Sequence, residues 1–433
     1  MPQSRSRPFI LALCAAACAG FAPACFAQEA PLMAGAAETA FRLPEGVPLA
    51  GYSRRKGRPS EGVHDPVGVR ALVLRRGSSR FALVSADLLI VDERVSQALR
   101  EELRGRGLPE PLTLMVAATH THAGPGAYGA RFAEKISMGH YDPAVFGALI
   151  GAIADSVEQA DAAAVPVRLS VGSARAPEAV KNRINDGGFV DDEVVCVIAR
   201  PAGQGEAAAP IAVAIGFSAH PTTLGAWFMQ LSADYPGVVR RELSVDFPGT
   251  VWLFFAGAVG DQAPVKRGDG FERAEWVGRR VAEAAREAMA EAVPASGGVL
   301  ETREALMPLP PARIRMGVLP LPGFLAARLV DDDASLSAAV ADGIAFIGLP
   351  CDMTAGLGAA LKAEARGRGW HPLLVGFAND YIGYCVPPEV YEHSDYEAAM
   401  AFNGPDTGAL IVERLSALLA DIARGPSGAG EPR

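Results

Sequence analysis

Short apolar runs alternate with helical patterns along most of the chain. The apolar runs often end in Gly, Pro or Asp and predict buried strands over 69–76, 81–91, 112–118, 211–219, 251–258, 344–350 and 372–378. Apolar positions at helical spacing predict helices over 93–106, 143–159, 237–243, 272–291, 355–366 and 407–424. This alternation predicts an α/β fold, with a mixed and mostly covered sheet and flanking helices.

The first 27 residues have the parts of a secretory signal. Two arginines precede an apolar run over 9–26, and small residues precede a cleavage position after Ala27. A membrane anchor is one alternative, which a proline and many alanines disfavour. A lipoprotein signal ending at Cys25 is another, and it lacks the usual bulky aliphatic residue. We therefore expect a periplasmic or secreted mature protein.

The composition of the mature chain limits the kind of protein it can form. We expect one large domain, or two closely packed lobes, over 28–424 and a disordered tail over 425–433. Three cysteines remain, which is too few for a disulfide scaffold, so the domain depends on its own apolar core. Removal of the two signal arginines changes the formal net charge from −9 to −11. An acidic chain argues against nucleic acid as a partner. The Pro- and Leu-rich stretch 307–330 is expected to be a surface excursion.

Polar side chains gather where predicted strands end, which is where sites form in open α/β sheets. The segments are ATHTH (118–122), SAHPT (218–222), LPCD (349–352) and FANDY (377–381). His120 and His122 point the same way if the chain stays extended, and His220 follows an equivalent run. Three imidazoles with carboxylates can hold Zn²⁺. Loop histidines hydrogen-bonded to the backbone are the alternative.

The same segment contains a weaker pattern. Glycines 124, 126 and 129 match G-x-G-x-x-G, which binds dinucleotides where a strand, a turn and a helix follow in close succession. No helix is predicted to begin there. A nicotinamide-dependent oxidoreductase is therefore a distant alternative.

The stretch THTHAGPGAYG resembles the neutral/alkaline ceramidase family. The resemblance continues in order through PLAGY, HDPVGVRALVL, FALVSADLL, the Asn-Arg pair at 182–183, FSAHPT with SADYPG, AGAVGDQAP, GLPCD, and ANDYIGY with EVYEH. It therefore covers almost the whole mature chain. The family's C-terminal immunoglobulin-like domain is expected to be absent, because the chain ends soon after the helix predicted over 407–424.

The resemblance implies roles for six residues. It assigns His120, His220, Asp352 and Tyr381 as zinc ligands, and His122 and Arg183 as catalytic residues beside the metal and the substrate carbonyl. Two positions depart from the family. Asp352 stands where the family has a glutamate, and Ala263 stands where it has a serine. Cys351 and Cys385 flank the implied ligands in sequence and could form a disulfide.

The function that the resemblance implies is a secreted zinc-dependent amidase. It would hydrolyse the N-acyl amide of ceramide to a fatty acid and a sphingoid base, in peripheral contact with a membrane surface. No amphipathic basic helix that would bind a membrane is predicted. The alternatives are a zinc amidase acting on another N-acylated compound and a non-catalytic relative that binds lipid or glycan.

Overall fold

The computed structural model describes residues 30–205, 208–316, 319–320, 329–394 and 396–425. From Pro31 onward the described residues form one compact unit. The predicted secretory signal and residues 426–433 of the predicted tail lie outside the described residues, as does part of the predicted excursion over 307–330.

Two main sheets form the centre of this unit. The larger has nine strands in the order β4 (Thr113–Ala118), β3 (Ser79–Ala86), β2 (Gly68–Arg76), β1 (Met33–Ala40), β5 (Val165–Arg175), β7 (Glu193–Pro201), β8 (Ala212–Phe217) and β9 (Val251–Ala256), with β11 (Val293–Pro294) beside β5. The smaller has the order β12 (Leu300–Pro308), β15 (Asp333–Ala341), β16 (Ile344–Leu349) and β18 (His371–Gly376). Both sheets are mixed, since β3–β4, β8–β9 and β16–β18 pair in parallel and their other pairs are antiparallel.

Three short two-stranded ladders complete the strands. They are β6 (Val180–Asn182) with β10 (Gln262–Pro264), β13 (Arg315–Met316) with β14 (Leu319–Pro320), and β17 (Asp352–Met353) with β19 (Tyr384–Cys385). The parallel β17–β19 ladder places Asp352 directly opposite Tyr384.

The helices agree with the predicted ones and add short segments. The six predicted helices are confirmed as α1 (Glu93–Gly105), α3 (Pro143–Ala162), α4 (Asp234–Ser244), α5 (Gly270–Ala290), α7 (Ala355–Gly367) and α10 (Thr407–Ala423). The unpredicted ones are the 3₁₀ helix η1 (Ser53–Arg55), α2 (Phe132–Met138), α8 (Pro388–His393) and α9 (Tyr396–Met400). Asp92 starts α1 as its N-cap, because its carboxylate accepts a hydrogen bond from the Val95 amide at 2.9 Å.

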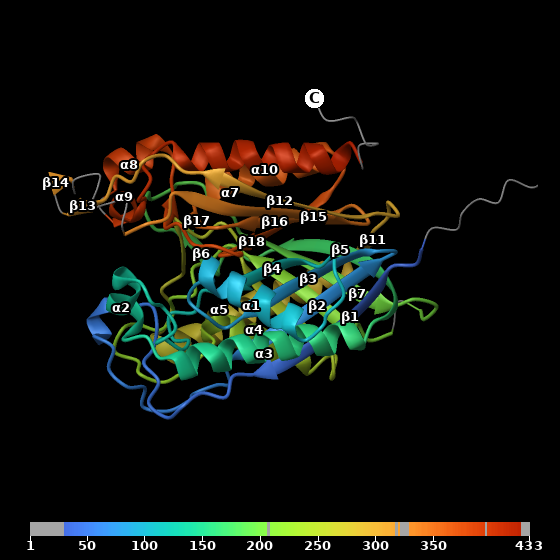
Figure 1. The fold of residues 1–433 in the computed structure, drawn as a ribbon, viewed down its shortest axis with the longest axis horizontal. Coiled ribbons are helices and arrows are strands. Elements are labelled where there is room, and N and C mark those ends of the chain that lie inside the picture. The colour runs from blue at the N-terminus through green and yellow to red at the C-terminus, as the bar shows by residue number, and fades with distance from the viewer. Residues whose placement is uncertain (1–29, 206–207, 317–318, 321–328, 395, 426–433) are drawn as a thin grey trace, which may run out of the picture. The chain divides into compact units, whose positions relative to one another are not determined.

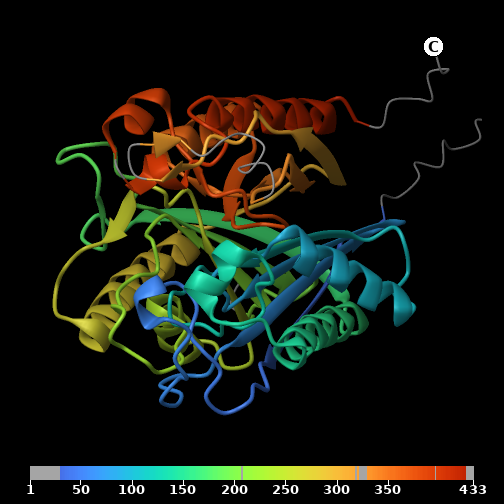
Figure 2. The same ribbon diagram turned by 60° about the vertical axis from the view of Figure 1, so that its left-hand side comes forward.

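The elements stack in four layers (Figures 1 and 2). The two sheets share an apolar core, in which the rings of Phe81 and Phe346 lie 5.5 Å apart. Helices α1, α3, α4 and α5 cover the outer face of the larger sheet, and α7 and α10 cover that of the smaller. Strands covered on both faces need apolar side chains at successive positions, which explains the continuous runs in the sequence. The predicted α/β fold is confirmed. Among the described residues, no helix is long and apolar enough to cross a membrane.

Candidate metal centre

The predicted strand-end residues meet at one site. His120 and His122 follow β4, His220 follows β8, and Asp352 and Tyr381 follow β16 and β18. All five line one cavity of about 390 Å³. The carboxyl ends of the parallel pairs bring these distant segments together, as expected for sites in α/β sheets.

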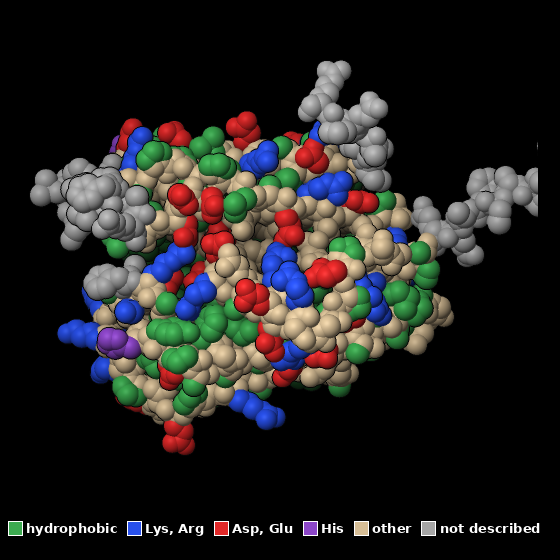
Figure 3. All heavy atoms as spheres, viewed as in Figure 1, with side chains coloured by type: hydrophobic (Ala, Val, Ile, Leu, Met, Phe, Trp, Pro, Cys, Tyr) green, Lys and Arg blue, Asp and Glu red, His purple; other side chains and the backbone are tan. Residues whose placement is uncertain are grey.

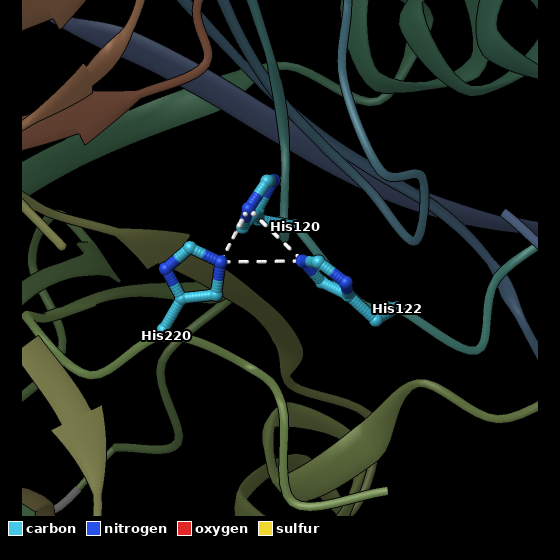
Figure 4. Close-up of side chains that lie close together, drawn as sticks. All are labelled: His120, His122 and His220. Carbon is cyan, nitrogen blue, oxygen red and sulfur yellow. Dashed lines mark hydrogen bonds between the residues drawn. The ribbon is translucent and has the colours of Figure 1, made fainter. Parts of the chain in front are cut away.

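The three imidazoles point their Nε2 atoms at one another (Figure 4). These atoms lie 2.9 Å apart in His120 and His220, 3.3 Å in His120 and His122, and 3.2 Å in His122 and His220. A tetrahedral zinc ion with bonds of about 2.0–2.1 Å separates its ligand atoms by roughly 3.3 Å. The triangle therefore has the size that a metal ion requires.

Backbone carbonyls fix the tautomers of two of these histidines. Nδ1 of His120 lies 2.6 Å from the Leu89 carbonyl, and Nδ1 of His220 lies 3.4 Å from the Val259 carbonyl. A carbonyl can only accept, so both Nδ1 atoms carry hydrogen and both Nε2 atoms present lone pairs. This is the usual arrangement of a metal-binding histidine.

His120 is also held by an unusual backbone. Its φ angle is 64°, and Phe377, whose ring stacks on the His120 ring at 3.8 Å, has a φ of 57°. Asn379, two residues on, has a φ of 64°. Non-glycine residues rarely adopt positive φ, and such conformations cluster where a fold must aim particular side chains.

His122 is held differently from the other two. Its Nδ1 makes no hydrogen bond of normal geometry, and the Gly51 backbone beside it has only a small effect on the pKa of the ring. By distance alone, its Nε2 could serve as a third ligand atom beside those of His120 and His220. The catalytic role that the resemblance implies for His122 stays a prediction.

Asp352 completes the polar side of the cavity. Its Oδ2 accepts a 2.8 Å hydrogen bond from the Tyr381 hydroxyl, whereas its Oδ1 is buried without a hydrogen-bond partner. That free Oδ1 lies 3.7 Å from His120 Nε2 and 3.7 Å from His220 Nδ1. An unpaired buried carboxylate oxygen is costly unless a cation or a donor reaches it. The carboxylate of Asp352 therefore fits a metal held by His120 and His220.

Burial sets the protonation of the site. It lowers the pKa of His120 to about 3, with a further contribution from the positive charge of Arg183, and lowers those of His122 and His220 well below 6.5. Burial also raises the pKa of Asp352 to about 7, against the opposing effects of Tyr381 and Arg183. The imidazoles are therefore neutral near pH 7, as metal ligation requires.

Tyr381 and Arg183 occupy different positions relative to the cavity. The Tyr381 hydroxyl is bound to Asp352, and burial followed by the Asp352 charge raises its pKa well above 10. Arg183 lies behind the cavity wall, where its Nη2 donates to the Gly260 carbonyl at 2.7 Å and the Tyr384 hydroxyl at 2.8 Å. The roles assigned to both by the resemblance stay predictions.

Tyr384 lines the cavity and was not singled out from the sequence. It faces Asp352 across the β17–β19 ladder and accepts the hydrogen bond from Arg183. The signal was present in ANDYIGY, where Tyr384 follows Tyr381 by three residues. A tyrosine that receives a hydrogen bond from arginine is a better donor toward the cavity.

The glycines of the G-x-G-x-x-G match serve close packing. A Cβ on Gly126 would lie 2.2 Å from the Met138 carbonyl oxygen, and one on Gly129 would lie 2.6 Å from the Glu134 Cβ. The chain needs glycine here because the loop runs against α2. Among the described residues, the first helix after His122 is α2, which begins only at Phe132, so the pattern has a packing role and the dinucleotide alternative loses its support.

Arg55 is a second residue that the sequence did not single out. Its side chain is 1% exposed and contacts the loops that carry the site. It donates to the backbone carbonyls of Ala50, His122, Gly225, Ala226 and Phe228. Burial lowers its pKa to about 10, which still leaves it charged at pH 7. One cation thus fixes the His122 backbone to two neighbouring loops.

Replacing Arg55 by methionine is expected to lower the free energy of unfolding by at least about 3 kcal/mol. Several buried carbonyls would lose hydrogen bonds to a charged group, each worth roughly 1.5–3 kcal/mol. Chemical denaturation measures this directly. Arg55→Lys is the matched control. Lysine keeps the positive charge but has fewer hydrogen-bond donors than the guanidinium group, so this variant should lose less stability than the methionine variant. Equal stability of the methionine variant and the wild type would contradict this role.

Cys351 and Cys385 are free and fully buried in the structure. Both belong to the apolar cluster between the smaller sheet and α7 and α10, and neither lines the cavity. The disulfide considered from the sequence is not formed. Ala263, which replaces the family serine, pairs with Lys181 in the β6–β10 ladder and also does not line the cavity.

We expect a Cys351→Ala/Cys385→Ala variant to keep its bound metal and its turnover, because both thiols face the apolar cluster. Metal analysis and a rate measurement check this. Thiolate is a strong zinc ligand, so loss of metal in the double variant would instead identify Cys351 as a ligand beside Asp352.

The fold and the geometry define a four-layer α/β protein with a histidine-rich candidate metal site at its strand ends. Residues 43–187 match the family model described as neutral/alkaline non-lysosomal ceramidase, N-terminal. This match assigns residues 43–187 to the family that the sequence resemblance predicted.

Relatives and solved structures agree with this assignment. The chain is 34% identical over 131 residues to the neutral ceramidase of Mycobacterium tuberculosis and 30% identical over 141 residues to that of Pseudomonas aeruginosa. These matches cover 28% and 32% of this chain but only 20% and 21% of the relatives. The crystal structure of the Pseudomonas aeruginosa neutral ceramidase superposes with a TM-score of 0.81 at 21% identity, covering 94% of this chain and 77% of that one. A ceramidase complexed with C2 gives a TM-score of 0.80 at 20% identity, covering 93% and 77%. At these identities the structures establish the shared fold.

Proposed function

We propose that this protein is a zinc-dependent amidase that hydrolyses the N-acyl amide of ceramide to a fatty acid and a sphingoid base. The observation that carries the proposal is the convergence of three Nε2 atoms within 3.3 Å of one another beside the unpaired Oδ1 of Asp352. The family match over residues 43–187 and the similar neutral ceramidases support the substrate class. We also propose, from the predicted signal, that it acts in the periplasm or outside the cell.

His120, His220 and Asp352 would hold the metal, with Tyr381 either as a fourth ligand or as the donor that orients Asp352. A bound zinc ion polarises carbonyl groups and makes water acidic enough to attack at neutral pH. The neutral histidine pair with fixed tautomers suits this ligation. The family glutamate reaches further than Asp352, so for Asp352 to act as a ligand the segment after β16 would have to lie closer to a bound metal.

The side chains around the metal ligands would carry the proton transfers and hold the substrate. His122 would accept a proton from water at Nε2 and pass it to the leaving amine, a step typically worth ~10²–10⁴ in rate. The Tyr384 hydroxyl, supported by Arg183 behind it, would donate to the amide carbonyl oxygen as charge develops there. Arg183 would thus act through Tyr384.

The cavity walls suit an acyl chain. The apolar lining comes from Leu89, Ile90, Met138, Ile382, Met400 and Phe402. The volume of about 390 Å³ is at the small end of the roughly 300–1,000 Å³ typical of ligand sites. Apolar wall residues beside polar catalytic groups suit an N-acylated lipid.

A substrate panel combined with metal analysis tests the proposal. We expect about one zinc per chain, loss of activity with a chelator, and recovery on addition of zinc. Ceramide should be hydrolysed faster than N-acyl amino acids or short N-acyl amines. Preference for one of the latter would make the protein an amidase of another N-acylated compound. Absence of metal and of turnover would favour a non-catalytic lipid- or glycan-binding relative.

A further inference from the structure

We propose that one side of the cavity mouth carries a docking surface for anionic phospholipid bilayers. The surface, called the rim here, consists of residues 53–58, 132–140 and 225–229. The proposal rests on the proposed function, because an enzyme that hydrolyses N-acyl lipids meets its substrate in a bilayer. The experiment that tests it measures vesicle binding and requires no hydrolysis.

Direct contacts hold the three rim segments together. The Gly51 amide, two residues before the first segment, donates to the Ser137 carbonyl at 3.0 Å and so holds that segment near α2. Arg55, in η1, donates to three carbonyls of the third segment at 3.0–3.3 Å. Segments far apart in the sequence therefore form one continuous surface.

The rim lies at the cavity opening. Ser53 of the first segment and Ile136 of the second both line the cavity that contains the three histidines. The Ile136 side chain is also 50% exposed. A lipid leaving the bilayer at this place would reach the candidate metal centre without crossing open water.

The rim is cationic, although the whole chain has a net charge of −9. Its exposed charged side chains are Arg54, Lys56, Arg58 and Lys135. The one acidic residue within the three segments is Glu134, which is buried and accepts a hydrogen bond from the Arg131 amide at 2.7 Å. Figure 3 shows Lys and Arg side chains along the left-hand edge of the molecule, where Figure 1 places α2.

The rim also exposes a large aromatic side chain. Trp227 is 67% exposed, whereas Trp252 is buried and the other two tryptophans are partly buried. Tryptophan is enriched at the boundary between lipid and water, because its ring is both apolar and polar. Together with Ile136 it offers apolar groups for shallow insertion between the cations.

The combination of features selects a bilayer as the occupant. Each Lys or Arg near an anionic surface strengthens binding roughly fivefold. Two separated apolar side chains beside exposed cations suit the headgroup region of a membrane, which adapts to an irregular surface. The sequence predicted no basic amphipathic helix, and here the cations come from a 3₁₀ turn and the exposed face of a short helix.

Vesicle sedimentation with the full chain tests the proposal. The vesicles contain phosphatidylcholine alone, or phosphatidylcholine mixed with phosphatidylglycerol, and no N-acyl substrate. We expect binding to the mixed vesicles that weakens with added salt. Arg54→Glu/Lys135→Glu should reduce that binding at least about 25-fold, since two attractive charges become repulsive. The matched control Arg104→Glu/Arg414→Glu makes the same change of net charge at exposed positions outside the rim and should bind like the wild type.

Tryptophan fluorescence gives a second reading of the same interaction. Addition of the mixed vesicles should shift the emission of the wild type to shorter wavelength, and Trp227→Phe should remove the shift. Equal binding to both vesicle types, equal losses in the two charge-reversal variants, or an unchanged shift in Trp227→Phe would overturn the proposal. So would binding to acidic proteins in place of vesicles. Failure of the ceramidase assay with intact vesicle binding would overturn only the proposed function.

Discussion

Replacing His120 or His220 by alanine is expected to empty the metal site and abolish amide hydrolysis. Each supplies an Nε2 whose lone pair is fixed by a carbonyl on the other side of the ring, so loss of either leaves an incomplete ligand set. Metal content per chain and turnover of an N-acyl lipid should fall together. His371→Ala is the matched control, because this exposed histidine lies at the start of β18 and should retain both.

His122→Ala is expected to behave differently from the other two variants. Metal content should remain near the wild-type value, while turnover falls by ~10²–10⁴, the usual contribution of a general acid–base group. The physical reason is that His120, His220 and Asp352 would still supply three ligand atoms in this variant. If His122→Ala lost the metal as completely as His120→Ala, the three close imidazoles would form a three-histidine ligand set and the role taken from the resemblance would be wrong.

Replacing Asp352 by alanine is expected to lower metal affinity more than about 100-fold. Loss of a residue that only hydrogen-bonds to a ligand typically lowers metal affinity by roughly 10–100-fold. Its Oδ1 is the unpaired buried oxygen closest to the histidine pair. Asp352→Glu should keep the metal but crowd the cavity and slow turnover. Competition with a chelator measures the affinities. Unchanged metal content and unchanged rate in Asp352→Ala would exclude a ligand role.

The same residue gives metal binding a pH dependence. Burial raises the pKa of Asp352 to about 7, so its carboxyl takes up a proton as the pH falls through this value and competes with the metal. The imidazoles stay neutral in that range because burial lowers their pKa values. Metal affinity should therefore fall below about pH 7. Asp352→Asn should bind more weakly but without this dependence, whereas a slope retained in that variant would point to another group.

A further variant separates the two roles open to Tyr381. Tyr381→Phe removes the hydroxyl and keeps the ring, so it deletes the hydrogen bond to Asp352 Oδ2. A loss of affinity close to that of Asp352→Ala would identify the tyrosine oxygen as a ligand. A loss of only about tenfold would identify Tyr381 as the partner that orients the carboxylate.

The sequence by itself determined the fold class and seven buried strands, but it did not mark the buried strands β7 and β15. Strands such as β4 and β16 are covered on both faces, so apolar side chains fill successive positions and the runs are visible without neighbours. Strand β5 was missed because it alternates between buried and exposed residues and contains charged side chains. Strand β1 was also missed, because it contains few bulky apolar residues. Its position in the sheet is set by pairing with β2 and β5.

The sequence also located the candidate site, because polar residues at the ends of apolar runs mark strand ends wherever those runs are buried. His120, His122, His220, Asp352 and Tyr381 were all found in this way or through the family motifs, and all line one cavity.

Only the tertiary structure decided how these residues differ from one another. The separate positions of His120 and His122 depend on a positive φ and on carbonyls of distant loops, and neither is encoded in the spacing His-x-His. Arg55 gave no signal, since an arginine in SRRKGR is typical of an exposed turn, and its five carbonyl partners come together only in the fold. Contacts between residues more than 150 positions apart are set by packing, so the periodicity and local preferences of a sequence cannot report them.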